Sequence, residues 1–194
     1  GNWQPALEYL RGRREIRELI LSGGDPLTLP DSRLRELVQR LERIPHLQRL
    51  RIHTRLPVVL PERIDDGLLS WIGRGRLDHV LVLHANHPRE FEAPAEEAIA
   101  RLRASGITLL NQSVLLAGVN DDADTLCTLQ EAAFRAGVLP YYLHLLDRAR
   151  GTSHFDVPEH RARELHAELQ ARLPGYLVPR LVREQPGEPG KTAV

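Results

Sequence analysis

Lys191 is the only lysine in this sequence of 194 residues, although lysine and arginine together number 26. An arginine can replace a lysine on most surfaces, but a guanidinium group stays protonated and cannot attack a carbonyl carbon, whereas a lysine amine can form an imine. The single exception in an arginine-rich sequence therefore indicates a reactive amine. The alternative is chance, because Lys191 lies in the terminus EQPGEPGKTAV, whose composition is typical of a disordered loop.

Short polar clusters follow five apolar stretches of the chain. They are SGGD at 22–25, HTR at 53–55, HANH at 84–87, NQS at 111–113 and HLLD at 144–147. If each stretch is a strand of one parallel sheet, all five clusters lie at its carboxyl edge, where α/β proteins build their sites. Each cluster alone could be a plain turn. Together, and rich in His, Gln and Arg, they predict one composite site.

The first cluster contains two glycines, which have no side chain, and a negatively charged aspartate. Gly23 and Gly24 after Ser22 let the main chain approach a ligand closely, and the carboxylate of Asp25 could hold an ammonium group. The stretch LILSGGDPL matches neither common phosphate-binding glycine pattern. A simple turn remains the alternative for this cluster taken alone.

Histidines at strand ends suggest a metal site, because His53, His84 and His87 are of a ligand type. No carboxylate stands at a familiar spacing beside them, and His84 and His87 need not converge. The single cysteine, Cys127, excludes an intrachain disulfide and a cysteine-built cluster within these residues. We therefore predict no metal ligands in this chain.

Two acids are candidates for binding a cationic substrate. Asp147 ends the fifth apolar stretch, and Glu184 lies seven residues before Lys191. The alternative is that they pair with Arg148 and Arg183 at the surface, which is the commoner fate of an acid beside an arginine.

Composition and charge narrow the class of protein. The formal net charge is zero, 42% of residues are hydrophobic and 27% are charged, as expected of one soluble globular domain. Neutrality argues against a nucleic-acid partner or an anionic membrane surface. The start GNWQPALEYL resembles no signal peptide and no apolar run could span a membrane, so we expect a cytoplasmic protein. The absence of methionine suggests a piece of a longer chain.

The order of the elements is that of five βα units and a parallel sheet. The predicted strands are 16–21, 47–55, 78–88, 107–113 and 138–147, with helices at 31–44, about 64–72, 93–105, 125–137 and 157–173. We also expect a helix at 2–11, a last extended segment at 176–184 and a loop beyond it. Asp31 is a candidate N-cap, Gly106 a candidate C′ residue and Pro158 a candidate first-turn residue.

In this order along the chain, the motifs resemble the lysine 2,3-aminomutase family of radical S-adenosylmethionine enzymes. The stretches that carry the resemblance are SGGDPL, RIHTRLPVVLPERI, HANHPRE, GITLLNQSVLLAGVND, PYYLHLLDRARGTSHF, PGYLVPRLVRE and PGEPGKT. They are most similar to the branch that makes (R)-β-lysine for elongation factor P.

The resemblance implies an α/β fold, a partial (β/α)6-type radical SAM barrel of parallel strands whose first strand is missing from this chain. Residues 1–183 would form the barrel and residues 184–194 a tail carrying the cofactor lysine. The missing strand would carry the cysteines of a [4Fe-4S] cluster, so the chain as given is expected to be inactive.

The resemblance also assigns roles to residues. It implies that Lys191 is the catalytic residue that forms an imine with pyridoxal 5′-phosphate. It implies that the methionyl end of S-adenosyl-L-methionine binds the segment formed by Ser22, Gly23, Gly24 and Asp25. It also implies that His84 and Gln112 contact the same cofactor. Asp147 would bind the side-chain ammonium of the substrate L-lysine, with Glu184 as a second acid. Pocket residues without an implied role are Arg55, Asn111, Ser113 and Tyr141.

The implied activity is isomerisation of L-lysine to (R)-β-lysine, with a functional link to elongation factor P and its ligase. One alternative is an aminomutase that acts on free lysine for another pathway. The other is a non-catalytic α/β binding fragment.

Overall fold

A single curved sheet organises the molecule in the computed structural model, which describes residues 3–147, 151–185, 187 and 190–194. Its strands follow in chain order from β1 to β7. They are β1 Glu18–Leu21, β2 Arg49–Thr54, β3 Asp78–His84, β4 Thr108–Val114, β5 Leu139–His144, β6 Arg180–Arg183 and β7 Thr192–Ala193. Neighbours from β1 to β6 are parallel, and β7 runs antiparallel to β6. This sheet is a curled half-barrel, as the α/β prediction requires.

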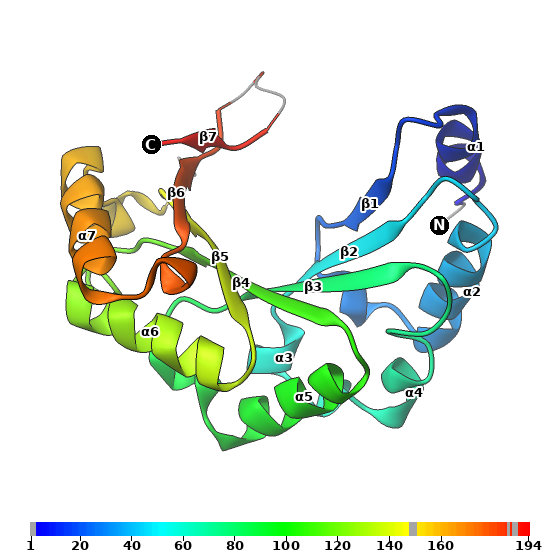
Figure 1. The fold of residues 1–194 in the computed structure, drawn as a ribbon, viewed down its shortest axis with the longest axis horizontal. Coiled ribbons are helices and arrows are strands. Elements are labelled where there is room, and N and C mark those ends of the chain that lie inside the picture. The colour runs from blue at the N-terminus through cyan, green and yellow to red at the C-terminus, as the bar shows by residue number, and fades with distance from the viewer. Residues whose placement is uncertain (1–2, 148–150, 186, 188–189) are drawn as a thin grey trace.

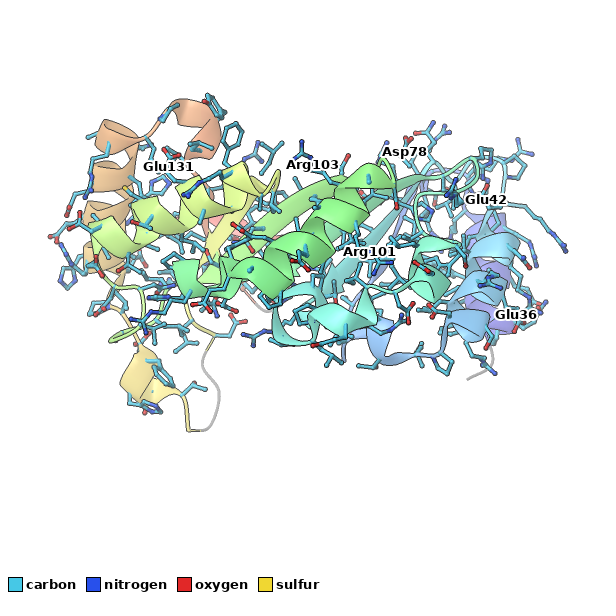
Figure 2. The ribbon with its side chains drawn as sticks, turned by 90° about the horizontal axis from the view of Figure 1, so that it is seen from below. Glu36, Glu42, Asp78, Arg101, Arg103 and Glu131 are labelled. Carbon is cyan, nitrogen blue, oxygen red and sulfur yellow. The ribbon has the colours of Figure 1, made fainter. Side chains whose placement is uncertain are left out.

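The helices cover the outer side of the curved sheet, and the two termini lie at opposite ends of the arc (Figure 1). They are α1 Gln4–Gly12, α2 Asp31–Leu41, α3 Leu56–Val59, α4 Asp66–Leu69, α5 Ala93–Ala104, α6 Ala123–Arg135 and α7 Glu159–Arg172. In the view from below, charged side chains such as Arg101, Arg103 and Glu131 lie along α5 and α6 (Figure 2). Within the described residues, no helix is long and apolar enough to cross a membrane.

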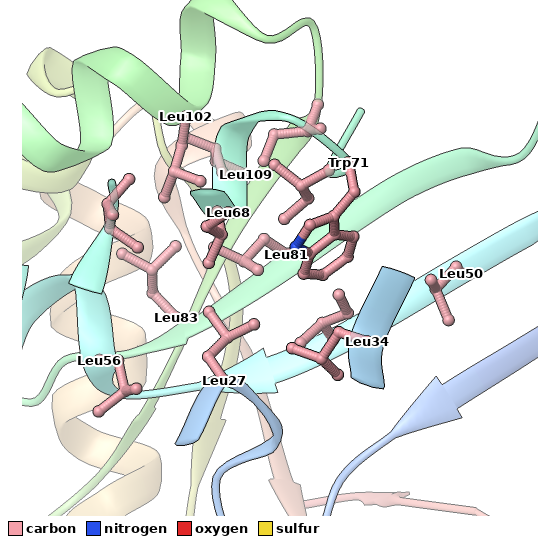
Figure 3. Close-up of a cluster of buried hydrophobic side chains, with 14 of the residues drawn as sticks. Leu27, Leu34, Leu50, Leu56, Leu68, Trp71, Leu81, Leu83, Leu102 and Leu109 are labelled. Carbon is pink, nitrogen blue, oxygen red and sulfur yellow. The ribbon is translucent and has the colours of Figure 1, made fainter. Parts of the chain in front are cut away.

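The core fills the space between the sheet and this layer of helices. Alternate residues of β2 are buried, so that Leu50 and Ile52 face the helices. Figure 3 shows Leu50 there with leucines of the neighbouring strands and helices and the Trp71 ring, and Ile52 belongs to the same cluster of buried side chains. A fully buried leucine contributes about 1.5–3 kcal/mol to stability, and this layer fixes the sheet whose other face bears the site.

Three of the predicted local features are corrected. Of the predicted helix at about 64–72, only the short helix α4 forms, capped by the Asp65 side chain, and it is preceded by α3 and a 3₁₀ turn Pro61–Arg63 that were not predicted. Pro30 rather than Asp31 is the N-cap of α2. The tail is not all loop, since β7 pairs with β6.

The other local predictions agree closely with the structure. Gly106 has a φ of +77° directly after the C-cap Ser105 of α5, as a C′ glycine should. Pro158 is the N-cap of α7, one residue before the first turn.

Candidate functional site

A cavity of about 680 Å³ lies at the carboxyl ends of β1 to β5. Lys191 and Glu184 line it from the tail side. The whole predicted cofactor-binding set also lines it: Ser22, Gly23, Gly24, Asp25, His84 and Gln112. The sheet therefore brings these dispersed residues to one place.

Strand alternation supplies part of the cavity wall, in which Arg51 and Tyr142 are residues that the sequence analysis did not name. In β2 the residues between the buried ones, Arg51 and His53, line the cavity. On β5, the Tyr141 and Tyr142 rings are stacked 3.8 Å apart, and Arg51 Nη1 donates a hydrogen bond of 3.0 Å to the Tyr141 hydroxyl. The polar residues that alternate with apolar ones in RLRIHT were the signal for this wall.

The loop after β1 is held in place by the carboxylate of Asp25. It accepts hydrogen bonds from the backbone N–H of Leu27 (3.0 Å) and of Arg55 (2.7 Å). The Thr54 hydroxyl lies 2.8 and 2.9 Å from its two oxygens and donates to it. In this structure Asp25 thus ties the loop to the end of β2, an arrangement that the sequence did not reveal.

The two glycines of this loop have backbone conformations that side chains disfavour. Gly23 has φ +81° and Gly24 φ +55°, and a Cβ on either would meet nothing within 4 Å. The glycines are thus required by backbone conformation, while the space beside them stays open toward the cavity.

Gly24→Ala is expected to destabilise the protein by about 1 kcal/mol, because only the left-handed conformation and no clash opposes the methyl group. Urea denaturation measures this cost. Gly12→Ala is the matched control, since Gly12 lies at the end of α1 with equally open space and no positive φ. An equal or smaller loss at Gly24 than at Gly12 would contradict the expectation.

Two imidazoles from neighbouring strands meet in the cavity wall. His84 Nε2 lies 3.4 Å from His53 Nδ1, with the rings edge to face. Burial lowers the pKa of His53 to about 4, with the His84 charge as the next cause, and burial also lowers the pKa of His84. Among the described residues, His53 Nε2 and Gln112 Oε1 are buried without a hydrogen-bond partner. Such atoms in a cavity wall are typical of a ligand site.

Lys191 is positioned by the β6–β7 pairing. Thr192 pairs with Arg183, which brings the preceding Lys191 beside Glu184. Lys191 Nζ donates a hydrogen bond of 2.7 Å to Glu184 Oε1 and lies 3.3 Å from His144 Nε2. It also lies 5.5 Å from the centroid of the Tyr142 ring. The amine therefore faces the cavity at the carboxyl edge of the sheet.

His144 is buried beside this amine, and burial, followed by the Lys191 charge, lowers its pKa to about 4. Below the ordinary histidine pKa of 6.5 the unfolded chain binds a proton that the folded chain rejects. The contribution to stability is complete above pH 6.5 and decreases as the pH falls toward 4. We expect the urea midpoint to decrease over this range and His144→Gln to make the decrease shallower. Parallel pH profiles for the two proteins would contradict this.

Asp147 lines a second cavity, of about 820 Å³, that adjoins the first. The other acids that line it are Asp156, Glu159 and Glu184, and Arg183 is the basic residue there. Of these, Glu184 lines both cavities. No bond joins Lys191 to Asp147 in the described part of the chain, and the acid in contact with the amine is Glu184.

The alternative for Asp147 and Glu184 was that they form ion pairs with neighbouring arginines at the surface, and the structure supports it only in part. Arg183 pairs with Glu159 at 2.8 Å, and Glu184 pairs with Lys191. Arg148, the other proposed partner, lies outside the described residues.

Of the pocket residues without a role, Arg55 and Tyr141 line the first cavity. Asn111 does not: it is buried on the other face of β4 and bonds the backbone N–H and C=O of Ala85. Ser113 is buried on the same face. These two residues support the fold.

His87 does not converge with the other histidines. Its side chain accepts a hydrogen bond from the backbone N–H of Arg89 and caps the 3₁₀ turn Pro88–Phe91. In the residues that the structure covers, no group of three or more His, Cys, Asp or Glu is arranged to hold a metal ion.

Comparison with solved structures identifies the class of fold. A radical SAM methyltransferase from Sphaerobacter thermophilus aligns with a TM-score of 0.58 over 94% of this chain and 54% of its own, at 18% identity. SuiB from Streptococcus suis, also solved with S-adenosylmethionine bound, aligns with a TM-score of 0.65 over 95% of this chain and 44% of its own, at 11% identity. The chain therefore has the partial-barrel fold of these proteins.

Sequence comparison finds relatives named as L-lysine 2,3-aminomutases. The L-lysine 2,3-aminomutases of Haemophilus influenzae and Escherichia coli are each 52% identical over 191 residues, which are 98% of this chain and 56% of each relative. That of Acetoanaerobium sticklandii is 39% identical over 97% of this chain and 45% of its own length. The chain is thus homologous along nearly its whole length to the lysine 2,3-aminomutase family, and it spans about half the length of these relatives. No family model matches it.

Proposed function

We propose that the full-length protein carrying this sequence is an L-lysine 2,3-aminomutase that converts L-lysine to (R)-β-lysine. The observation that carries the proposal is the Lys191 amine at the cavity at the carboxyl edge of the sheet, in a chain related to L-lysine 2,3-aminomutases. The finer part of the proposal is that the β-lysine serves to modify elongation factor P.

The residues of the cavity fit two of the proposed cofactors. Lys191 would hold pyridoxal phosphate, since its side chain is 22% exposed and its amine is within reach of a ligand in the cavity. The loop 22–25 with His84 and Gln112 would hold S-adenosylmethionine. The unpartnered atoms of His53 and Gln112 support a polar ligand there. When bound, the two cofactors supply the hydrogen abstraction and the stabilisation of the rearranging substrate.

The contribution of this chain is positioning and charge. Glu184 and Asp147 would pair with the side-chain ammonium of L-lysine from the acidic second cavity. A neutral amino acid would leave these acids without a partner, which disfavours its binding. His144 and Tyr142 hold the Lys191 amine at the boundary of the two cavities.

The iron–sulfur cluster does not fit the residues of this chain. Its single cysteine, Cys127, is buried on α6, and a [4Fe-4S] cluster needs several cysteine thiolates. The cluster ligands would belong to another part of the full-length protein, and the 194-residue chain alone would be inactive.

The test is an assay of the full-length protein with L-lysine, S-adenosylmethionine, pyridoxal phosphate and a reductant, under anaerobic conditions. We expect (R)-β-lysine on chiral chromatography, none when S-adenosylmethionine is omitted, and none from the 194-residue chain. A fully loaded protein that leaves L-lysine unchanged would refute the proposal and favour a non-catalytic binding role.

The pathway needs its own experiment, because an enzyme that makes β-lysine for elongation factor P and one that makes it for another pathway carry out the same conversion. Deleting the gene should remove β-lysine from elongation factor P, and added (R)-β-lysine together with the ligase should restore it. Unchanged modification in the deletion strain would favour a free-lysine pathway. We place the reaction in the cytoplasm, where the factor and its ligase act.

A further inference from the structure

Glu184 lines both cavities and already forms an ion pair with a residue of this chain. Its Oε1 accepts the 2.7 Å hydrogen bond from Lys191 Nζ, while its side chain also lines the acidic second cavity. The hydrogen bond from Lys191 and the charge of that ammonium lower the pKa of Glu184, which favours its carboxylate form.

Among the described residues that line the first cavity, no other carboxylate is positioned to replace Glu184 as the partner of Lys191. The described residues that line the first cavity include two acids, Asp25 and Glu184. The oxygens of Asp25 are engaged by Leu27, Thr54 and Arg55. Arg51 and Arg55 add positive charge to the same wall. The Lys191 ammonium therefore depends on Glu184 for its neutralisation.

We propose that Glu184 is an exchangeable counter-ion, which pairs with the Lys191 ammonium until that nitrogen loses its charge and only then binds the side-chain ammonium of a diamino acid. The proposal rests on the proposed function, since that function gives Lys191 a reason to lose its charge. A consequence is that binding is ordered. The group that reacts with Lys191 binds first, and the substrate binds after it.

Electrostatics supports this exchange. Two ammonium groups that share one carboxylate lie within a few ångströms of each other, and in a partly buried site their repulsion disfavours binding of the second. Glu184 Oε2 and Asp147 leave a weak site for a second ammonium while Lys191 is charged. Removing the Lys191 charge removes the repulsion and frees Oε1.

The test removes the charge without any cofactor. Full-length wild-type protein and its Lys191→Met variant are prepared free of pyridoxal phosphate and S-adenosylmethionine, and L-lysine binding is measured by ligand-observed NMR. We expect Lys191→Met to bind L-lysine roughly tenfold more tightly than the wild type. Adding Glu184→Gln should abolish this gain, whereas adding Asp156→Asn, a change to an acid of the second cavity, should leave most of it.

L-norleucine serves as the matched ligand, because it has the same chain without the terminal ammonium. Its affinity should be equal for the wild type and Lys191→Met. Equal affinity of the two proteins for L-lysine, no measurable binding by the variant, or a gain that persists with Glu184→Gln would overturn the proposal.

A second measurement does not depend on substrate. Reductive ¹³C-methylation labels the lysines of the full-length protein, and the signal that disappears in Lys191→Arg is assigned to Lys191. We expect Glu184→Gln to shift this signal at neutral pH, because it removes the carboxylate that accepts the Lys191 hydrogen bond. An unchanged signal would contradict the pairing.

These results separate the two proposals. Borohydride trapping of pyridoxal phosphate on Lys191 tests the proposed function and does not involve L-lysine binding. If an adduct is trapped but Lys191→Met does not bind L-lysine more tightly, the proposed function stands and the counter-ion exchange is refuted. If Lys191→Met binds L-lysine more tightly but no adduct is trapped, the counter-ion exchange stands and the proposed function is refuted.

Discussion

Lys191→Arg is expected to abolish covalent attachment of pyridoxal phosphate and to lower aminomutase activity of the full-length protein by at least about a thousandfold. The guanidinium keeps the positive charge and can still pair with Glu184, so the tail should stay in place. It lacks a deprotonated amine at neutral pH and cannot bond to an aldehyde carbon. The change therefore removes the chemistry of Lys191 and preserves its charge.

The measurement is borohydride reduction in the presence of pyridoxal phosphate, followed by peptide mapping and the activity assay. Arg172→Lys is the control, because it adds an exposed lysine on α7, where Arg172 pairs with Asp124 outside the first cavity. In that variant the label should remain on Lys191. Retained activity in Lys191→Arg, or preferential labelling of the new lysine, would show that the position of Lys191 does not determine its reactivity.

The sequence was sufficient for the order of the strands and for the edge at which the site lies. Both follow from local patterns: apolar stretches of strand length, helices between them, and a polar cluster after each of the first five strands. Parallel strands then bring those clusters together by topology alone. This is why residues as far apart as Ser22, His84 and Gln112 could be assigned to one cavity before the structure was known.

The errors arose where long-range contacts determine the outcome. Asp31 has the residue type and position of an N-cap, but its carboxylate accepts hydrogen bonds from Arg63 Nη2 (2.8 Å) and Trp71 Nε1 (2.9 Å). Arg63 and Trp71 lie more than 30 residues further along the chain. A local pattern cannot reveal such a competition between an N-cap and distant donors.

The prediction for the tail was limited in the same way, because a long-range contact determines its structure. Its composition indicated a loop, and only the pairing of β7 with β6 gives Lys191 its place beside Glu184. The sequence did single out Lys191, as a lysine that stands alone among arginines. It did not supply the contact with His144, because a histidine within a predicted strand does not reveal which neighbour it will meet.

Asp25→Ala is expected to cost about 2–4 kcal/mol in the free energy of unfolding and to weaken S-adenosylmethionine binding. The substitution leaves the Thr54 hydroxyl, which is 2% exposed, without its acceptor and leaves the Arg55 N–H without a partner. The Thr54 oxygen in turn accepts from the Leu56 N–H, so the loss reaches the start of α3. The loop 22–25 would lose its attachment to β2 while its glycines favour other conformations.

Urea denaturation and calorimetric titration with S-adenosylmethionine measure the two effects. Asp122→Ala is the matched control, since Asp122 caps α6 through a hydrogen bond from Thr125 N–H and lies away from the cavity. It should cost about 1 kcal/mol and leave cofactor binding unchanged. Because the Asp25 carboxylate joins two strand ends, its removal should cost more than the loss of a single cap. Equal costs at Asp25 and Asp122 would mean that the loop keeps its shape through the backbone alone.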